Sequence, residues 1–408
     1  MAEQPLSGMR VLEWSLFHNG PAAGSMLGDL GAEVIKIEHP VEGDATRGIA
    51  TISGAPAFLP GGRTTLFEGA NRNKKGITLN LQSEEGREVA YRLVAKCDVF
   101  ATNFRRSVAQ RLGLDYASLS KHNPKLIYGI ALGWGGLGAD SDQRVFDQLV
   151  QARSGLMWAA GDRDNPEPQM VQGAVVDQMG ATMFAYGILS ALLARERYGI
   201  GQEVEASLLG SALHLQAVNV NTVAWQGRAA PRHSRTRARN PMDNHYRCRD
   251  DKWLRLAEIQ SDRFWNEFCE ALEAPHLATE PCFATMEDRR QSHQKLVSIL
   301  DGIFMARDRD DWLKTFTERG CRFARAPINT MEDALEDPQA LVNEYVVDFD
   351  HPTMGRVKTI GFPVKLSSSP LTIKSSAPEF GQHTEEVLQD LGGYSWEEIS
   401  GMRSRGVL

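Results

Sequence analysis

The first forty residues alternate between short apolar runs and a helical segment, which is the pattern of a β-α-β unit. Residues 9–16 are mainly apolar, residues 21–30 have helical spacing closed by Gly31, and residues 33–38 (EVIKIE) alternate as a strand does. The alternation continues with strands predicted at 77–81, 98–101, 125–132 and 203–208 and a helix at 84–96. We therefore predict an α/β fold with a mainly parallel sheet that has helices on both faces.

The length of 408 residues exceeds what one hydrophobic core usually supports. An arginine-rich stretch at 227–241 has little periodicity and is typical of a linker or an exposed loop. The residues that follow it are rich in Trp and Phe, which favours a small α+β domain. We predict a large domain over 1–225, a small domain with its basic linker over 226–325, and a further segment over 326–408.

Composition argues against several classes of partner. A net charge of −7 gives no basic footprint for nucleic acid. The five cysteines have no zinc-binding spacing and fit reduced thiols in the cytoplasm. The N-terminus lacks the pattern of a secretory signal, and the longest apolar stretch, residues 183–194, is too short to cross a bilayer. We expect no metal, no membrane association and a core helix over 177–198.

Asp177 stands immediately before this predicted core helix. Aspartate is among the commonest helix caps, so the residues alone favour a capping role over a catalytic one. The turn Asn19-Gly20-Pro21 opens the first helix, whose N-terminus offers free N–H groups to an anion. Because this turn lacks the GxGxxG pattern, a nicotinamide enzyme with Glu38 on the ribose is disfavoured.

Two clusters carry cations and amides beside predicted strands. One is Asn71–Gly76 (NRNKKG), and the other is Asn103–Arg106 (NFRR) followed by Arg111. We expect both clusters at strand carboxyl ends, where ligands collect in open α/β sheets. A pair of solvated basic loops is an equally good interpretation of the spacing alone.

Several blocks, in order, carry a resemblance to the family III CoA-transferases, the group that includes formyl-CoA transferase and carnitine CoA-transferase. The resemblance covers nearly the whole chain. The matching blocks are Gly20-Pro21, Gly31–Glu38 (GAEVIKIE), Gly43-Asp44 with Arg47, Asn71–Lys75 (NRNKK), Val99–Phe104 (VFATNF), Asp147–Ala152 (DQLVQA), Ser154–Met157 (SGLM), Tyr198–Ser207 (YGIGQEVEAS) and Gly381–Thr384 (GQHT).

The resemblance implies that Asp177 is the nucleophile and that the backbone N–H groups of Phe17, His18 and Asn19 stabilise the oxyanion. It implies a Rossmann-like large domain built from both chain ends, an inserted small domain and an interlocked dimer, either a homodimer or a heteromer with a paralogous subunit. The substrates are an acyl-CoA and a free carboxylic acid, and no cofactor beyond CoA is needed. The helix N-terminus is expected to keep Asp177 ionised at neutral pH.

The resemblance also implies where the CoA nucleotide binds. The expected contacts are His39, Asn73, Lys75, Asn103, Phe104 and Arg111. His39 departs from the arginine frequent at its position, and Leu132 departs from a lysine of formyl-CoA transferase, so Arg72 or Arg105 is expected to supply a missing phosphate contact.

Two alternatives remain open, and the substrate acids are not fixed. A 2-methylacyl-CoA racemase requires a second proton-transfer group, and Phe146 stands where related racemases have histidine. An acyl-CoA-binding subunit without turnover is the other alternative. The glycine-rich loop of formyl-CoA transferase has no counterpart between residues 225 and 260, which disfavours oxalate and formate. Residues 235–246 either bind a second carboxylate or form a solvated linker, and residues 240–246 resemble transferases of succinate and arylsuccinates such as benzylsuccinate.

Overall fold

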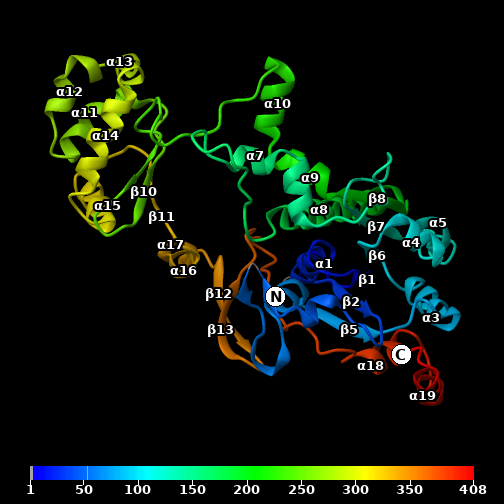
Figure 1. Cartoon of the computed structure of the whole chain (residues 1–408). Coiled ribbons are helices and arrows are strands. Elements are labelled where there is room, and N and C mark those ends of the chain that lie inside the picture. The colour runs from blue at the N-terminus through cyan, green and yellow to red at the C-terminus, as the bar shows by residue number, and fades with distance from the viewer. Residues whose placement is uncertain (1–2, 53) are drawn as a thin grey trace. The chain divides into compact units, whose positions relative to one another are not determined.

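The computed structural model describes residues 3–52 and 54–408 and divides the chain into two compact units (Figure 1). Unit 1 contains the residues up to 160 together with 168–230 and 344–408. Unit 2 contains 161–167 and 231–343. Unit 1 is therefore assembled from both ends of the chain, with unit 2 inserted between them.

A six-stranded sheet forms the centre of unit 1, and every strand pairing in it is parallel. Its order is β5-β2-β1-β6-β7-β8. The strands are β1 (Arg10–Trp14), β2 (Glu33–Glu38), β5 (Lys74–Thr78), β6 (Val99–Thr102), β7 (Ile127–Leu132) and β8 (Gln202–Ser207). The α/β fold with a mainly parallel sheet is confirmed. Its third strand in chain order begins at Lys74, three residues before the predicted start, and this offset matters for the site.

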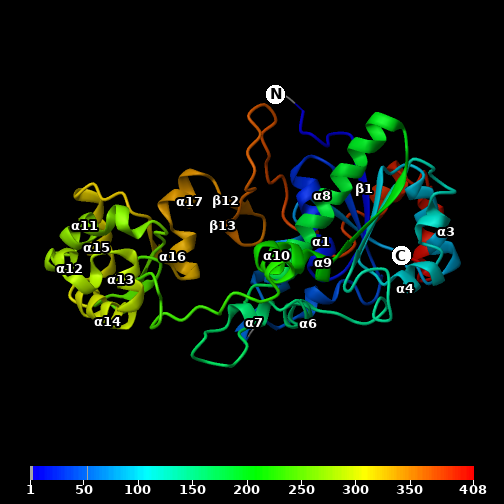
Figure 2. The same ribbon diagram turned by 90° about the horizontal axis from the view of Figure 1, so that it is seen from above.

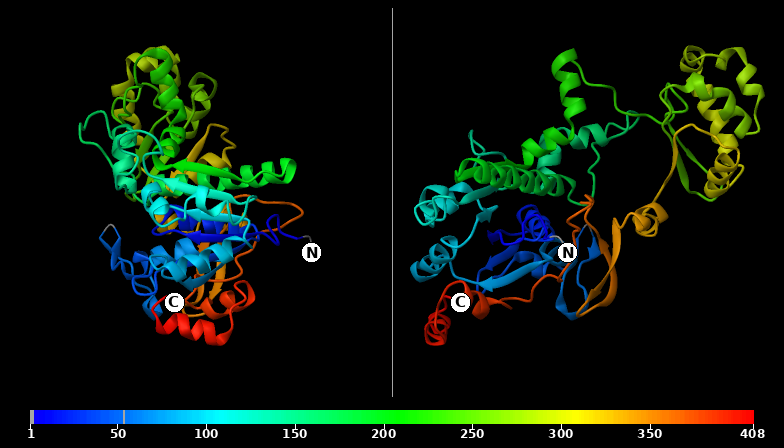
Figure 3. Two further views of the ribbon diagram at one scale, coloured as in Figure 1. Left: turned by 90° about the vertical axis from the view of Figure 1, so that its right-hand side faces the viewer. Right: turned by 180° about the vertical axis from the view of Figure 1, so that it is seen from behind.

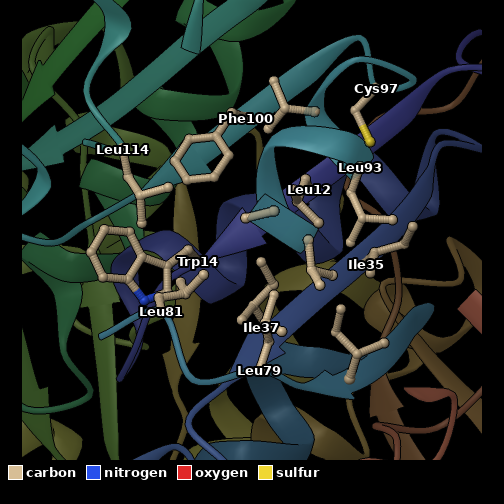
Figure 4. Packing of buried hydrophobic residues seen from close by; sticks show 14 of the residues in the cluster. Leu12, Trp14, Ile35, Ile37, Leu79, Leu81, Leu93, Cys97, Phe100 and Leu114 are labelled. Atoms are coloured by element: carbon tan, nitrogen blue, oxygen red, sulfur yellow. The ribbon is translucent and has the colours of Figure 1, made fainter. Parts of the chain in front are cut away.

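Side-chain alternation along the strands produces one apolar core on each face of the sheet. Leu12 pairs in register with Ile35 and Phe100, and all three belong to one buried cluster. Figure 4 shows this cluster from close by. Their neighbours Val11 and Val34 belong to the cluster on the other face. This period of two is what a sheet buried on both faces requires.

Different helices cover the two faces. The face of Val11 is covered by α1 (Asn19–Asp29) and α8 (Val175–Tyr198). The face of Leu12 is covered by α3 (Glu84–Val94), α4 (Arg106–Arg111), α5 (Tyr116–Leu119), α18 (Thr384–Asp390) and α19 (Trp396–Ser404). Figure 3 shows the two C-terminal helices in red near the end of the chain.

Helix α8 is the longest helix and lies beside α1 (Figure 2). By length and composition alone it is the single helix of the described chain that is apolar enough to cross a membrane. Within unit 1, however, Ala181, Phe184 and Ile188 are fully buried against the sheet. A side chain at Gly129 of β7 would meet the Phe184 ring at 2.8 Å, so this glycine permits the close packing of helix and strand. Helix α8 is a core helix of unit 1.

The remaining elements of unit 1 are shorter. The hairpin of β12 and β13 contacts α2 through His351, whose Nε2 lies 3.2 Å from the Glu68 carboxylate. These elements are β3 (Thr51–Ile52), β4 (Ala55–Pro56), α2 (Thr65–Asn71), α6 (Asp147–Arg153), α7 (Leu156–Ala160), α9 (Leu208–Leu215), α10 (Ala217–Gln226), β12 (Val346–His351) and β13 (Gly355–Ile360), with 3-10 turns η1 (Ala45–Gly48) and η2 (Pro60–Gly62).

Unit 2 packs an aromatic core, including Trp265, Phe304 and Trp312, beside a three-stranded antiparallel sheet in the order β11-β10-β9. The sequence predicts a boundary at residue 326, whereas β11 spans this position and pairs with β10, and unit 2 continues to Asn343. Its elements are β9 (His245–Arg247), β10 (Trp253–Leu256), α11 (Ser261–Ala271), α12 (His276–Thr279), η3 (Pro281–Phe283), α13 (Met286–Gln291), α14 (His293–Phe304), α15 (Arg309–Glu318), β11 (Arg325–Ile328), α16 (Met331–Leu335) and α17 (Pro338–Val342).

Candidate active site

A cavity of about 600 Å³ in unit 1 lies at the carboxyl ends of the sheet strands and contains Asp177. Trp14 ends β1, His39 follows β2, Asn103 follows β6 and Leu132 ends β7, and all four line this cavity. The carboxyl edge of an open parallel sheet is where such folds bind ligands. Nine of the predicted site residues line it: Phe17, His18, Asn19, His39, Asn103, Phe104, Arg105, Arg111 and Asp177.

Asp177 is the third residue of α8 and does not cap it. The N-cap position belongs to Ala174. The capping acceptor comes from Asp147, whose Oδ2 accepts hydrogen bonds from the backbone N–H groups of Val176 (2.8 Å) and Asp177 (3.1 Å). The interpretation of Asp177 as a helix cap is therefore wrong. A residue thirty positions earlier performs that function, which leaves the Asp177 carboxylate available to the cavity.

Asp147 is itself held firmly. It is buried at the start of α6, and its Oδ1 accepts a hydrogen bond from the Gln151 side chain. Gln151 also donates to the carbonyl of Val171 (2.8 Å) and accepts from its N–H (3.0 Å). This chain of contacts connects the approach to α8 with α6. The Asp147 carboxylate that holds the backbone of Asp177 is thus itself held in place by Gln151.

The pKa of Asp177 is raised to about 7, first because burial removes the carboxylate from water and second because the negative charge of Asp147 is close. This direction is opposite to the one expected from a helix N-terminus. The helix dipole contributes only about 0.3–1 kcal/mol at a terminus, and here burial and the neighbouring carboxylate outweigh it. The carboxyl therefore titrates near neutral pH, a property typical of groups with a chemical role.

The turn between β1 and α1 faces Asp177 and is held by side chains from other strands. Asn103 accepts from the N–H of Leu16 (2.9 Å) and donates to its carbonyl (2.7 Å). The next residue, Phe17, adopts a left-handed conformation with φ of 63°. For a bulky residue this conformation costs about 1–3 kcal/mol and persists only where the surroundings impose it.

A buried ion pair imposes the conformation of this turn. Lys36, fully buried on β2, lies 3.0 Å from Asp44 and donates to the carbonyl of Ser15 at 2.7 Å. Asp44 in turn accepts from the N–H of Phe17 at 3.4 Å. The Phe17 N–H is directed at Asp44 and is therefore a poorer candidate for an oxyanion donor. The N–H groups of His18 and Asn19 remain candidates, because they lie at the start of α1, where N–H groups lack intrahelical partners.

Side chains of this turn also reach α8. Nε2 of His18 lies 2.9 Å from Oε1 of Gln178, the residue after Asp177. A side chain at Gly180 would lie 2.9 Å from the amide nitrogen of Asn19, so the glycine allows the close approach of Asn19 to the first turns of α8. The start of α1 and the start of α8 thus form one surface around the Asp177 carboxyl.

Three predicted CoA contacts lie outside the Asp177 cavity, and the expectation that their cluster lies at a strand carboxyl end is wrong. Arg72 is bound to Asp29, Asn73 donates to the same carboxylate at 2.7 Å, and Lys75 lies 2.8 Å from both Glu33 and Glu386. Asn73 and Lys75 line a separate cavity of about 420 Å³. The reason is the register of β5, which begins at Lys74 and therefore places this cluster at its amino end.

The carboxyl end of β5 brings different residues to the active cavity: Leu79, Leu81 and Gln82. Arg144 also lines the cavity and adds a cation that the sequence does not single out. Among the predicted contacts, Phe104 stacks on Trp14 at 4.0 Å, so one face of its ring is covered, and Arg105 lies 3.5 Å from Asp142. A prediction of β5 with its observed bounds would have placed the residues after β5 in this cavity.

The segment 235–246 belongs to unit 2 and is not a solvated linker. Arg235 pairs with Asp301 at 2.7 Å and Arg237 with Asp164 at 3.1 Å. Tyr246 is buried, and its hydroxyl donates to the carbonyl of Pro241 at 2.7 Å. These two arginines already have acidic partners within their own unit.

Comparisons with known proteins agree along the whole length. The family described as CoA-transferase family III matches residues 6–384. The (R)-2-hydroxy-4-methylpentanoate CoA-transferase of Clostridioides difficile is 30% identical over 404 residues, which cover 99% of both chains. The succinyl-CoA–L-malate CoA-transferase beta subunit of Chloroflexus aurantiacus is 30% identical over 413 residues, covering 99% of this chain and 98% of the relative. The crystal structure of a CAIB/BAIF family protein from Brucella suis, 30% identical, superposes with a TM-score of 0.86 over 96% of this chain and 100% of that one.

Proposed function

Because the chain belongs to CoA-transferase family III and transfers CoA between acyl-CoA thioesters and carboxylic acids, we propose that Asp177 is its nucleophile. The observation that carries this proposal is the placement of Asp177 in the cavity at the carboxyl edge of the sheet, with its backbone held by Asp147. Its carboxyl is relieved of capping and titrates near neutral pH. A carboxyl that caps no helix is free to attack, and a pKa of about 7 leaves about half of it as the reactive carboxylate at neutral pH.

The chemistry proceeds by exchange of acyl bonds. An oxygen of Asp177 attacks the thioester carbonyl, the C–S bond breaks, and CoA leaves as a thiolate with a mixed anhydride formed. The thiolate attacks the aspartyl carbon, the donor acid leaves as a carboxylate, and an aspartyl-CoA thioester remains. The acceptor carboxylate then reverses these steps. Each intermediate is an activated acyl compound, so the acyl bond energy is conserved without ATP.

Donors for the developing oxyanion come from the start of α1. The N–H groups of His18 and Asn19 lie at a helix N-terminus, where they favour negative charge. The turn before them is fixed by Asn103 and by the Lys36–Asp44 ion pair, so the donors need no rearrangement when charge develops. We assign the stabilisation of both tetrahedral intermediates to this turn.

We propose succinyl-CoA as the donor and a dicarboxylate such as an arylsuccinate as the acceptor. The similarity to the succinyl-CoA–L-malate CoA-transferase beta subunit of Chloroflexus aurantiacus supports the donor. The cavity adds Arg105, Arg111 and Arg144, cations that suit CoA phosphates and a second carboxylate. A racemase is disfavoured because Phe146 cannot exchange a proton. Loss of α-deuterium from a chiral 2-methylacyl-CoA in the absence of any acceptor would favour the racemase instead.

We also propose that the protein works in the cytoplasm as a homodimer or as a heteromer with a paralogue. Helix α10 supports an assembly because it buries no residue within the chain and exposes Val218 and Trp225. An exposed apolar helix is typical of a surface that another chain covers. Sedimentation of the purified chain alone distinguishes a homodimer from a subunit that stays monomeric without its paralogue.

Chemical trapping tests the nucleophile. The protein is incubated with a panel of acyl-CoA donors, treated with hydroxylamine and digested, and the Asp177 peptide is examined by mass spectrometry. A hydroxamate at Asp177 is expected with competent donors and not in the Asp177→Asn variant. If Asp177→Asn alone transfers CoA as fast as the parent, the proposed nucleophile is wrong. If parent and variant are equally active only when a paralogous subunit is added, the binding-subunit interpretation gains support.

A further inference from the structure

Two phenylalanine rings remain exposed inside the cavity that contains Asp177. Phe17 is 38% exposed and Phe146 is 52% exposed, although both line the cavity. Their ring centroids are 5.6 Å apart and their planes are inclined by 86°, an edge-to-face arrangement. Large apolar side chains that remain in contact with water inside a ligand cavity gain stability when a ligand covers them.

Each ring is one residue away from a contact to the nucleophile segment. Phe17 precedes His18, whose imidazole lies 2.9 Å from the side chain of Gln178. Phe146 precedes Asp147, whose carboxylate accepts the N–H of Asp177 at 3.1 Å. The two rings therefore line the cavity of the Asp177 carboxyl from the starts of two different helices, α1 and α6.

The backbone at Phe17 is arranged to present its ring. Its φ of 63° is unusual for a bulky side chain, and the N–H that this conformation exposes is directed at the buried Asp44. Strained residues cluster at ligand clamps, where the surroundings enforce them. The buried Lys36–Asp44 pair thus holds the backbone of the residue that carries this ring.

We infer that Phe17 and Phe146 form an aryl clamp that selects substrate acids carrying an aromatic ring near the carboxylate. This inference rests on the proposed function, because it places the acid beside Asp177. The aromatic ring of a bound acid would pack against the Phe17 and Phe146 rings. This contact would remove apolar surface of all three rings from water. The side chains of Val145 and Leu208 line the same cavity and extend its apolar wall.

Polar groups near the clamp can bind a second carboxylate of the acid, but they do not replace the contact to its aromatic ring. His18 follows Phe17, and Arg144 stands two residues before Phe146 and lines the cavity. The two effects are separable with four acceptor acids: propanoate, 3-phenylpropanoate, succinate and benzylsuccinate. The aryl clamp predicts that each aryl acid is used better than its partner without the ring, whether or not a second carboxylate is present.

The experiment measures kcat/KM for the four acids with one CoA donor that supports hydroxamate formation at Asp177. For the parent, the ring is expected to raise kcat/KM roughly tenfold to a hundredfold, the range for burying one large apolar group. Phe146→Ala should lose most of this advantage while use of propanoate changes less than about threefold. Phe146→Tyr keeps an aromatic ring and should retain the advantage for aryl acids. Phe58→Ala, which removes an exposed phenylalanine outside the cavity, should behave as the parent.

Equal use of aryl and non-aryl acids by the parent would overturn the aryl clamp. An equal loss for all four acids in Phe146→Ala would also overturn it, because the ring would then support the CoA donor or the nucleophile. The hydroxamate at Asp177 is a separate readout. If it forms while acid selectivity is absent, the clamp fails and the proposed nucleophile stands.

Discussion

The carboxylate of Asp147 holds the backbone of Asp177, with a distance of 3.1 Å between Oδ2 of the first residue and the N–H of the second. The same charge that fixes the helix start also raises the pKa of the Asp177 carboxyl beyond the effect of burial. One buried side chain therefore influences both the position and the ionisation of the proposed nucleophile.

The rate of the first acyl transfer should depend on pH with a midpoint near 7. Only the carboxylate attacks, and the pKa of Asp177 is raised to about 7, so the rate should rise about tenfold between pH 6 and pH 8. Rapid-mixing measurement of CoA release in the absence of an acceptor reports this step. A flat profile over this interval would show that the carboxyl is already fully ionised.

Replacement of Asp147 by Asn should move this midpoint to lower pH. The amide oxygen can still accept from the N–H groups at the start of α8, but the repulsive charge is removed. Asp147→Ala removes the acceptor as well and should lower the free energy of unfolding by about 0.5–2 kcal/mol, as loss of a helix cap does. An unchanged midpoint in Asp147→Asn would mean that burial alone sets the pKa.

Asp177→Asn should be more stable than the parent in a pH-dependent way. The folded state binds the proton of Asp177 more tightly than the unfolded state, because its pKa is raised from 3.8 to about 7. The parent consequently loses stability as the pH rises from about 4 to about 7, and the neutral amide does not. The difference in Tm between the two proteins should therefore increase over this interval and then level off. A constant difference from pH 4 to pH 8 would contradict the raised pKa.

Lys36→Met should destabilise the protein strongly. It leaves the carboxylate of Asp44 buried without its cation, whereas Glu13 keeps its pair with Lys74 at 2.8 Å, and breaking a buried pair in this way costs about 3–5 kcal/mol. Urea denaturation measures the loss. Lys314→Met, which affects an exposed pair with Glu318, should change the unfolding free energy by less than about 1 kcal/mol. Similar losses in both variants would argue against the role of the buried pair.

The two cavities should respond differently to loss of a cation. Arg111→Ala and Arg144→Ala remove charges from the cavity that contains Asp177 and should raise KM for the acyl-CoA roughly tenfold, since a charge-assisted hydrogen bond to phosphate contributes about 1.5–3 kcal/mol. Lys75→Ala removes a charge from the other cavity, where Lys75 is paired with Glu33 and Glu386. Its KM should remain close to that of the parent. A rise in KM for Lys75→Ala with none for Arg111→Ala would restore Lys75 as a CoA contact and argue against Arg111.

The alternation of apolar runs along the chain was sufficient to predict the parallel α/β sheet, because a strand buried on both faces and a helix that covers it have distinct periodicities. The blocks between Gly20 and Thr384 also identified the family. Asp177, by contrast, could be selected only by resemblance. Its local sequence is equally suited to a helix cap, and the residue that performs the capping, Asp147, lies thirty positions away.

Strand register, burial and contacts between distant residues were decided by the tertiary structure. A start of β5 at Lys74 rather than Ile77 places Asn73 and Lys75 at the amino end of the sheet and brings Leu79 to the active cavity. The pKa of Asp177 depends on how far folding removes it from water and how near Asp147 then lies. Local sequence determines which elements form, while the surroundings of a side chain depend on segments that only the folded chain brings together.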